Sequence, residues 1–221
     1  MDLREITGPE ALKKVPVDQL DALCDQLRET MLTRIAAHGG HVGPNLGFLE
    51  ATVALHYVFN SPVDKIVFDV SHQAYPHKML TGRMAAYLDP AKYDDISGYS
   101  EPGESPHDHF IVGHTSTSVS LACGLAKARD LKGERFNVIA VIGDGSLTGG
   151  MAFEGLNSFS EQGGNGIIVF NDNRCPSPRT TAASSVHSRS CARRREEIRA
   201  ISSRRSDSTT CMSTRATTST S

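Results

Sequence analysis

The chain has 221 residues, of which 38% are hydrophobic, and this is enough for one sizeable domain. No apolar run approaches the roughly 18 residues that a membrane-spanning helix needs, so the sequence argues against a membrane protein. The first residues lack the basic and apolar pattern of a secretion signal and the Arg- and Ser-rich pattern of a transit peptide. We therefore expect a cytoplasmic protein.

The net charge of −2 conceals an uneven distribution along the chain. Residues 1–173 carry 13 Lys and Arg against 22 Asp and Glu, whereas residues 174–221 carry 10 against 3. Ser, Thr and Arg make up 30 of the last 48 residues, and this segment has too little apolar surface to offset its chain entropy on folding. We predict a disordered basic tail. It contains no aromatic residue for stacking on bases, which makes nucleic acid an unlikely partner.

Two helical patterns precede the first predicted strand. Apolar residues recur every three or four positions over residues 18–37, which predicts an amphipathic helix. A second, mostly apolar pattern covers residues 49–59, and His56 within it is expected to have a structural role. The glycine-rich turn between the two patterns, residues 39–47, carries His41.

Three runs rich in β-branched residues, 65–70, 137–142 and 166–170, are typical of buried strands. They alternate with helical patterns, including residues 119–129 and 149–160, which predicts an α/β doubly wound parallel sheet. Ligands of such sheets bind beyond the carboxyl ends of the strands. The polar residues in loops at these positions are His72, His114, Asp144 and Asn173. Hydroxyl groups and free amides also cluster before residue 119, a place suited to an anion.

The motif GDG at residues 143–145 is followed after 25 intervening residues by NDN at residues 171–173. An Asp-Gly pair alone is common in ordinary turns, so only the combination is informative. It places the Asp144 carboxylate and the Asn173 amide at the tips of adjacent strands. Mg²⁺ prefers such oxygen ligands and completes its shell with water and phosphate oxygens. The pattern therefore predicts a diphosphate bound through a metal ion.

Several longer motifs carry a family resemblance: GGHVGPNLG, FDVSHQAYPHKMLTGR, GHTSTS, GDGSLTGGMAFEGLN and IIVFNDN. Over residues 1–173 the chain resembles the N-terminal part of 1-deoxy-D-xylulose-5-phosphate synthases, thiamine-diphosphate enzymes of the transketolase group. The resemblance implies a homodimeric transferase of isoprenoid and thiamine precursor synthesis. Its substrates would be pyruvate and glyceraldehyde 3-phosphate, and its products deoxyxylulose 5-phosphate and carbon dioxide.

The resemblance also implies roles for individual residues. Asp144 and Asn173 would hold Mg²⁺, while Gly145, Ser146 and Asn173 would contact the diphosphate of the cofactor. His41 would lie near the reacting carbons, and the other residues lining the cofactor would be His72, Gly113, His114 and Thr115. The three histidines are the candidate catalytic residues. Ser71 stands where the best-known members have glycine and Thr115 where they usually have serine, so the acceptor substrate is less defined than the cofactor.

The resemblance ends at residue 173, where the composition changes. With suitable synonymous codons, reading the following bases one nucleotide earlier gives MSIAENHGGL, the kind of continuation that family members have. We therefore predict that residues 174–221 are an out-of-frame translation of a longer gene. The glutamate that activates the cofactor belongs to another domain in this family, so we expect no turnover from the 221-residue chain.

Three alternatives stay open. The first is another transketolase-type enzyme, and the second is a fragment that binds the cofactor without catalysis. The third is an interaction protein that uses the basic tail, with its arginines as phosphate contacts.

Overall fold

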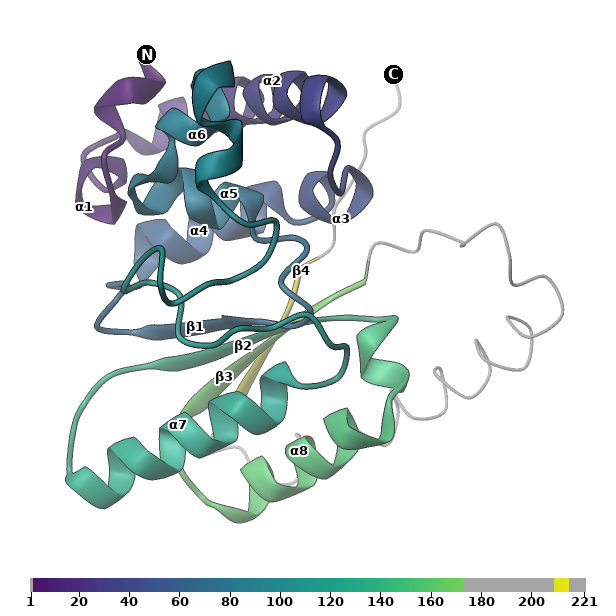
Figure 1. Ribbon diagram of the computed structural model, residues 1–221. Helices are drawn as coiled ribbons and strands as arrows, with labels where there is room; N and C mark the ends of the chain where they lie inside the picture. Colours follow the sequence, from purple (N-terminus) through teal and green to yellow (C-terminus); the bar gives the residue numbers. More distant parts are fainter. Residues whose placement is uncertain (1, 173–208, 215–221) are drawn as a thin grey trace, which may run out of the picture.

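The computed structural model describes residues 2–172 and, for the backbone, residues 209–214. It contains a parallel sheet with strand order β1-β2-β3-β4 (Figure 1). The strands are β1 (Lys65–Phe68), β2 (Val138–Gly143), β3 (Gly166–Asn171) and β4 (Thr209–Thr214). The register pairs Phe68 with Val141 and Gly143 with Asn171. The carboxyl ends of the first three strands therefore lie at one edge of the sheet, as the sequence predicted.

Helices cover both faces of this sheet (Figure 1). Helices α1 to α6 lie on one side, and α7 and α8 lie on the other. Their bounds are α1 (Pro9–Leu12), α2 (Leu20–His38), α3 (Gly43–Leu46), α4 (Leu49–Val58), α5 (Tyr75–Lys78), α6 (Ala85–Leu88), α7 (Ser118–Lys132) and α8 (Gly150–Glu161). The prediction of a doubly wound α/β fold is confirmed.

The alternation of side chains along β2 explains why both faces need cover. Val138, Ala140 and Ile142 pack against α7 and α8, whereas Ile139 and Val141 pack into the opposite cluster with Phe48 and Leu55. Successive residues of a strand point to opposite faces, so a strand that is apolar throughout is stable only between two layers. A third cluster joins α2, α4, α5 and α6 to one another.

The residue pattern predicts no helix or strand in residues 73–88, and the polar, Gly-, Pro- and Ser-rich composition of residues 89–108 predicts a long loop. The first segment instead forms α5, a π-helical turn (Met79–Arg83) and α6, and the second begins with a 3₁₀ turn (Pro90–Asp95). Gly82 has a φ of +92° inside the π-helical turn, which interrupts the helical pattern and hides it from a periodicity analysis. Among the residues that the structure describes, no helix combines the length and apolar character needed to cross a membrane.

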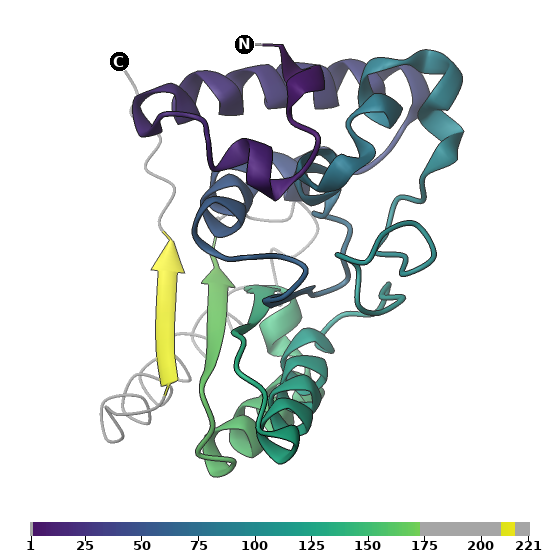
Figure 2. The same cartoon turned by 90° about the vertical axis from the view of Figure 1, so that its left-hand side faces the viewer.

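One part of the tail differs from the expected disorder. Residues 209–214 form β4, which pairs in parallel with β3 from Gly166↔Thr209 to Asn171↔Thr214 (Figure 2). This segment is rich in β-branched threonine, and the outer edge of β3 offers unpaired backbone groups. The Ser, Thr and Arg composition of the tail as a whole hides this local propensity. The other residues of the tail, and Asn173, lie outside the described residues, so the reading-frame hypothesis stays a prediction.

Candidate functional site

The candidate site lies on the loops at the carboxyl edge of β1, β2 and β3. His72 follows β1, and Asp144 follows β2, where its backbone N–H donates to the Asn171 carbonyl oxygen at 3.0 Å. Asp144 is half-buried. Within residues 2–172 no three His, Cys, Asp or Glu side chains form a metal cluster.

A pair of histidines lies beside this edge. The rings of His41 and His72 meet edge to face with their centroids 5.4 Å apart, although the residues belong to different loops. The fully buried Asn45 holds the two loops together, because its Nδ2 donates to the carbonyl oxygens of His41 and His72, both at 2.7 Å. Its Oδ1 accepts from the Tyr75 N–H at 2.9 Å. One side chain thus fixes the backbone beneath both rings.

The protonation of His72 suits a ligand-binding role. Burial lowers the pKa of His72, and the neighbouring His41 lowers it further. The imidazole is therefore neutral near pH 7. Its Nδ1 is buried and has no hydrogen-bond partner within the described part of the chain. A buried polar atom without a partner is unfavourable, so this nitrogen fits a group that a bound cofactor would bring.

The hydroxyl of Tyr75 lies close to His41. It accepts the backbone N–H of His41 at 3.2 Å, and it lies 3.5 Å from the ring Nδ1. Gly40 makes this approach possible, because its φ is +138° and a Cβ there would lie 2.7 Å from the hydroxyl oxygen. Only glycine combines this backbone conformation with the missing side chain.

The loop that carries His114 is attached to β1 by a buried carboxylate. Asp69 directly follows β1 and accepts the backbone N–H groups of Ser116 and Ser118, each at 2.8 Å. This corrects part of the sequence analysis, which treated the amides at the start of α7 as free for an anion. Residues 113–115 stay exposed and turn toward solvent from this anchor, and His114 Nδ1 lies 2.7 Å from the Thr115 carbonyl oxygen.

The same loop contacts the GDG loop. The Ser116 hydroxyl donates to the Ser146 carbonyl oxygen at 2.6 Å, and a Cβ on Gly149 would collide with that hydroxyl. Gly145 is exposed and Ser146 half-buried at the start of a 3₁₀ turn. The loops bearing His41, His72, His114 and Asp144 are therefore joined into one continuous edge by hydrogen bonds.

Known proteins share the sequence motifs and the fold of this chain. A family model described as 1-deoxy-D-xylulose-5-phosphate synthase matches residues 3–219. The chain belongs to the 1-deoxy-D-xylulose-5-phosphate synthase family. It is 51% identical to the synthase of Symbiobacterium thermophilum over 173 residues, which is 78% of this chain and 27% of that protein. It is 49% identical to the synthase of Carboxydothermus hydrogenoformans over 185 residues, which is 84% of this chain and 30% of that protein.

A solved structure supports the fold. Transketolase from Campylobacter jejuni matches with a TM-score of 0.59 at 19% identity, covering 72% of this chain and 29% of that one. The chain thus spans less than a third of each of these three proteins. The family resemblance seen in the motifs is confirmed.

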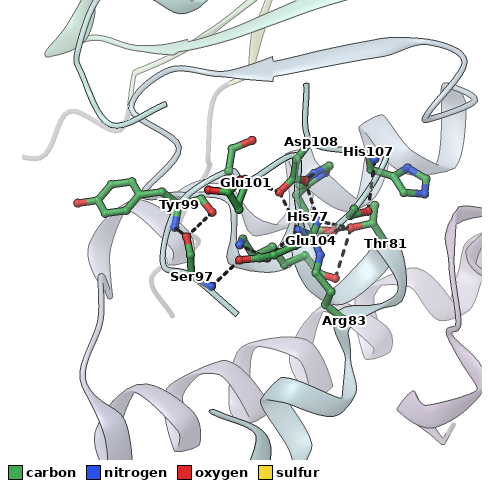
Figure 3. A network of polar contacts seen from close by, with 12 residues as sticks. His77, Thr81, Arg83, Ser97, Tyr99, Glu101, Glu104, His107 and Asp108 are labelled. Carbon is green, nitrogen blue, oxygen red and sulfur yellow. Dashed lines mark hydrogen bonds and ion pairs between the residues drawn. The ribbon is translucent and has the colours of Figure 1, made fainter. Parts of the chain in front are cut away.

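The motif YPHKMLTGR, residues 75–83, takes part in a buried network of hydrogen bonds and ion pairs that the sequence did not predict (Figure 3). Asp108 accepts two hydrogen bonds from Arg83, at 2.7 and 2.8 Å, and lies 2.8 Å from His77 Nε2. Burial alone would raise the pKa of Asp108, but the hydrogen bonds from Arg83 and His77 outweigh it and hold this pKa well below its usual value. Asp108 is therefore a buried carboxylate at neutral pH.

The network continues in both directions. His77 Nδ1 lies 2.8 Å from His56 Nε2, so the structural role expected for His56 is confirmed. The ammonium of the fully buried Lys78 pairs with Glu104, which also accepts from Arg83. The sequence signal was the density of charged and polar residues in YPHKMLTGR, but their partners lie 21 to 31 residues away in a loop. The network anchors that loop next to the candidate site.

Proposed function

We propose that this chain is the cofactor-binding part of a thiamine-diphosphate-dependent 1-deoxy-D-xylulose-5-phosphate synthase. The whole protein would be a cytoplasmic homodimer that joins pyruvate to glyceraldehyde 3-phosphate with loss of carbon dioxide. Curated 1-deoxy-D-xylulose-5-phosphate synthases share about half of the aligned residues with the chain. The observation that carries the proposal is the meeting of the His41–His72 pair and Asp144 on joined loops at one sheet edge.

The residues at this edge suit the cofactor and its metal. Asp144 would hold Mg²⁺ together with Asn173, and the cofactor diphosphate would lie against Gly145, Ser146 and Asn173. The exposed turn of Gly113, His114 and Thr115 would line the cofactor from the neighbouring loop. Thiamine diphosphate, when bound, supplies the nucleophilic carbon and the electron sink that decarboxylation requires.

The histidines have separate tasks in this proposal. Neutral His72 offers the unpartnered Nδ1 as a hydrogen-bonding group to the bound cofactor. The backbone of His41 is held by Asn45 and Tyr75, and its ring packs against the rings of His72, Tyr75 and Tyr99. A ring held in this way can transfer a proton or stabilise negative charge on a substrate oxygen. His114, on the exposed turn, would be the third histidine that lines the cofactor.

Calorimetric titration of the 221-residue chain with thiamine diphosphate, with and without Mg²⁺, tests the proposal. We expect saturable binding that requires Mg²⁺. Asp144→Ala should weaken it at least about tenfold, because it removes one of the few protein ligands of the metal. The backbone hydrogen bond from residue 144 to Asn171 survives this change.

Asp18→Ala is the matched control, because Asp18 is an exposed carboxylate near the far end of α2 from His41. This control should bind as the original chain does. Equal affinity of the two variants, or binding that is indifferent to Mg²⁺, would refute the proposal.

A further inference from the structure

Ser71 makes an unusual connection at the end of β1. Its side chain is fully buried, and its hydroxyl donates to the Val112 carbonyl oxygen and accepts the Ser100 N–H, both at 2.9 Å. The backbone of Ser71 has a φ of +66°, in the left-handed region where residues with a Cβ are uncommon. Glycine would suit this backbone better, yet glycine could make neither hydrogen bond. The serine therefore adopts an unfavourable backbone conformation and gains two side-chain hydrogen bonds.

The Ser100 contact decides where Tyr99 lies. The Tyr99 ring packs edge to face on His41, with the ring centroids 5.7 Å apart. Its backbone is held locally by Ser97, whose hydroxyl donates to the Tyr99 carbonyl oxygen at 2.9 Å and accepts its N–H at 3.0 Å. Figure 3 shows the Tyr99 side chain directed away from the buried network. The Ser71 hydroxyl, through the Ser100 N–H, links this turn to the end of β1.

The Val112 contact acts on the other arm of the same loop. Val112 directly precedes the exposed turn that carries His114. Between the two arms, the Asp108 carboxylate accepts the Glu101 N–H at 2.8 Å, and Glu104 accepts the Ser97 N–H at 2.6 Å. The buried network thus holds the middle of the loop, and Ser71 holds the two arms against the strand end.

We infer that Ser71 is a positioning residue, whose hydroxyl holds Tyr99 beside His41 and the His114 turn against the end of β1. The Tyr99 ring then borders the site beside His41. A group that binds at His41 would contact this ring. The inference deepens the proposed function and rests on it for its ligand. The hydrogen bonds themselves can be tested without any ligand.

The structural test uses Ser71→Gly, Ser71→Ala and the control Ser118→Ala. Ser118 is also fully buried, but its hydroxyl has no partner among the described residues. Both Ser71 variants lose the acceptor of the Ser100 amide, so we expect its hydrogen exchange, followed by NMR, to accelerate about five- to tenfold. The nuclear Overhauser contacts between the Tyr99 and His41 rings should weaken in both. Ser118→Ala should leave both signals unchanged.

Comparison of the two Ser71 variants separates positioning from stability. Glycine relieves the left-handed backbone, so Ser71→Gly should unfold at a higher temperature than Ser71→Ala while losing the ring contacts equally. If Ser71→Gly keeps the slow Ser100 exchange and the Tyr99–His41 contacts, the inference is wrong.

A second arm measures the affinity of each variant for thiamine diphosphate with Mg²⁺. We expect Ser71→Gly to bind more weakly than the original chain and the exposed control Asp18→Ala to bind equally well. If the original chain does not bind the cofactor, the proposed function fails, while the exchange and ring-contact data still decide the role of Ser71. Unchanged affinity in Ser71→Gly would refute the part of the inference that concerns the ligand.

Discussion

Single buried polar side chains position the loops of this site. Asn45, Asp69 and Ser71 each bond to backbone groups of segments that are distant in sequence, between 27 and 49 residues away. Backbone groups in loops have no helix or strand partner, and their burial without one is unfavourable. In the loops that carry His41, His72 and His114, these side chains therefore supply the hydrogen bonds that a helix or strand would otherwise provide.

Asn45→Ala should reveal how much one such residue contributes. It leaves two carbonyl oxygens and the Tyr75 N–H without their partner, so we expect the free energy of unfolding to fall by about 2–4 kcal/mol. Urea unfolding followed by circular dichroism measures the change. Asn157→Ala, at an exposed position of α8, is the control and should stay within about 0.5 kcal/mol. Equal effects of the two variants would contradict this role for Asn45.

At the scale of elements, α7 and α8 pack closely because glycine lies at their contact. A Cβ on Gly155 of α8 would lie 2.8 Å from the Ser120 hydroxyl and 3.0 Å from the Ser120 backbone nitrogen on α7. Both helices cover β2 and β3 through a shared apolar cluster, so their spacing also sets the loops that lead into the site. The GDG motif leads into α8 through the 3₁₀ turn Ser146–Thr148, and the His114 turn precedes α7.

Two glycine replacements in these helices should have opposite signs. Gly124 of α7 has open space where a Cβ would lie, so Gly124→Ala should stabilise the chain by about 0.5–1 kcal/mol through helix propensity alone. Gly155→Ala gains the same propensity but forces α7 and α8 apart, and we expect a net loss of about 1–3 kcal/mol. Thermal and urea unfolding measure both. Stabilisation by Gly155→Ala would show that the helix contact adapts without strain.

At the scale of the whole molecule, the buried network joins the helical layer to the loop over the sheet edge (Figure 3). It includes His56 and His77, and burial lowers the pKa of both. His107 and His109 flank Asp108, and the pKa of each is lowered to about 4, with burial as the largest cause. His77 and Lys65 contribute to the lowering of both and Arg83 to that of His107, whereas the Asp108 carboxylate opposes it.

The free energy of unfolding should therefore fall already at pH values above those at which the carboxylates become protonated. The ordinary histidine pKa of 6.5 applies to the unfolded chain, whereas the folded values of His107 and His109 are about 4. The unfolded chain thus binds more protons between these limits, so the free energy of unfolding should fall as the pH drops from 6.5 to about 4. Below that range the lowered pKa of Asp108 adds to the loss.

Urea unfolding at a series of pH values measures this dependence. Added NaCl should change the slope little, because the groups are partly or fully buried and weakly screened. A free energy of unfolding that is constant or rises as the pH falls through this range would contradict the explanation.

The sequence by itself determined the first three strands, the longer helices around them, and the position of His72 and Asp144 in loops that follow strands. These features rest on local patterns, such as β-branched runs, glycine turns and helical periodicity, which neighbouring residues impose on one another. Only the tertiary structure decided that Asp69 occupies the amides of α7, that Ser71 holds Tyr99 to His41, and that Asp108 pairs with His77 and Arg83. Those partners lie tens of residues apart, and no local pattern records which buried polar groups will meet when the layers pack.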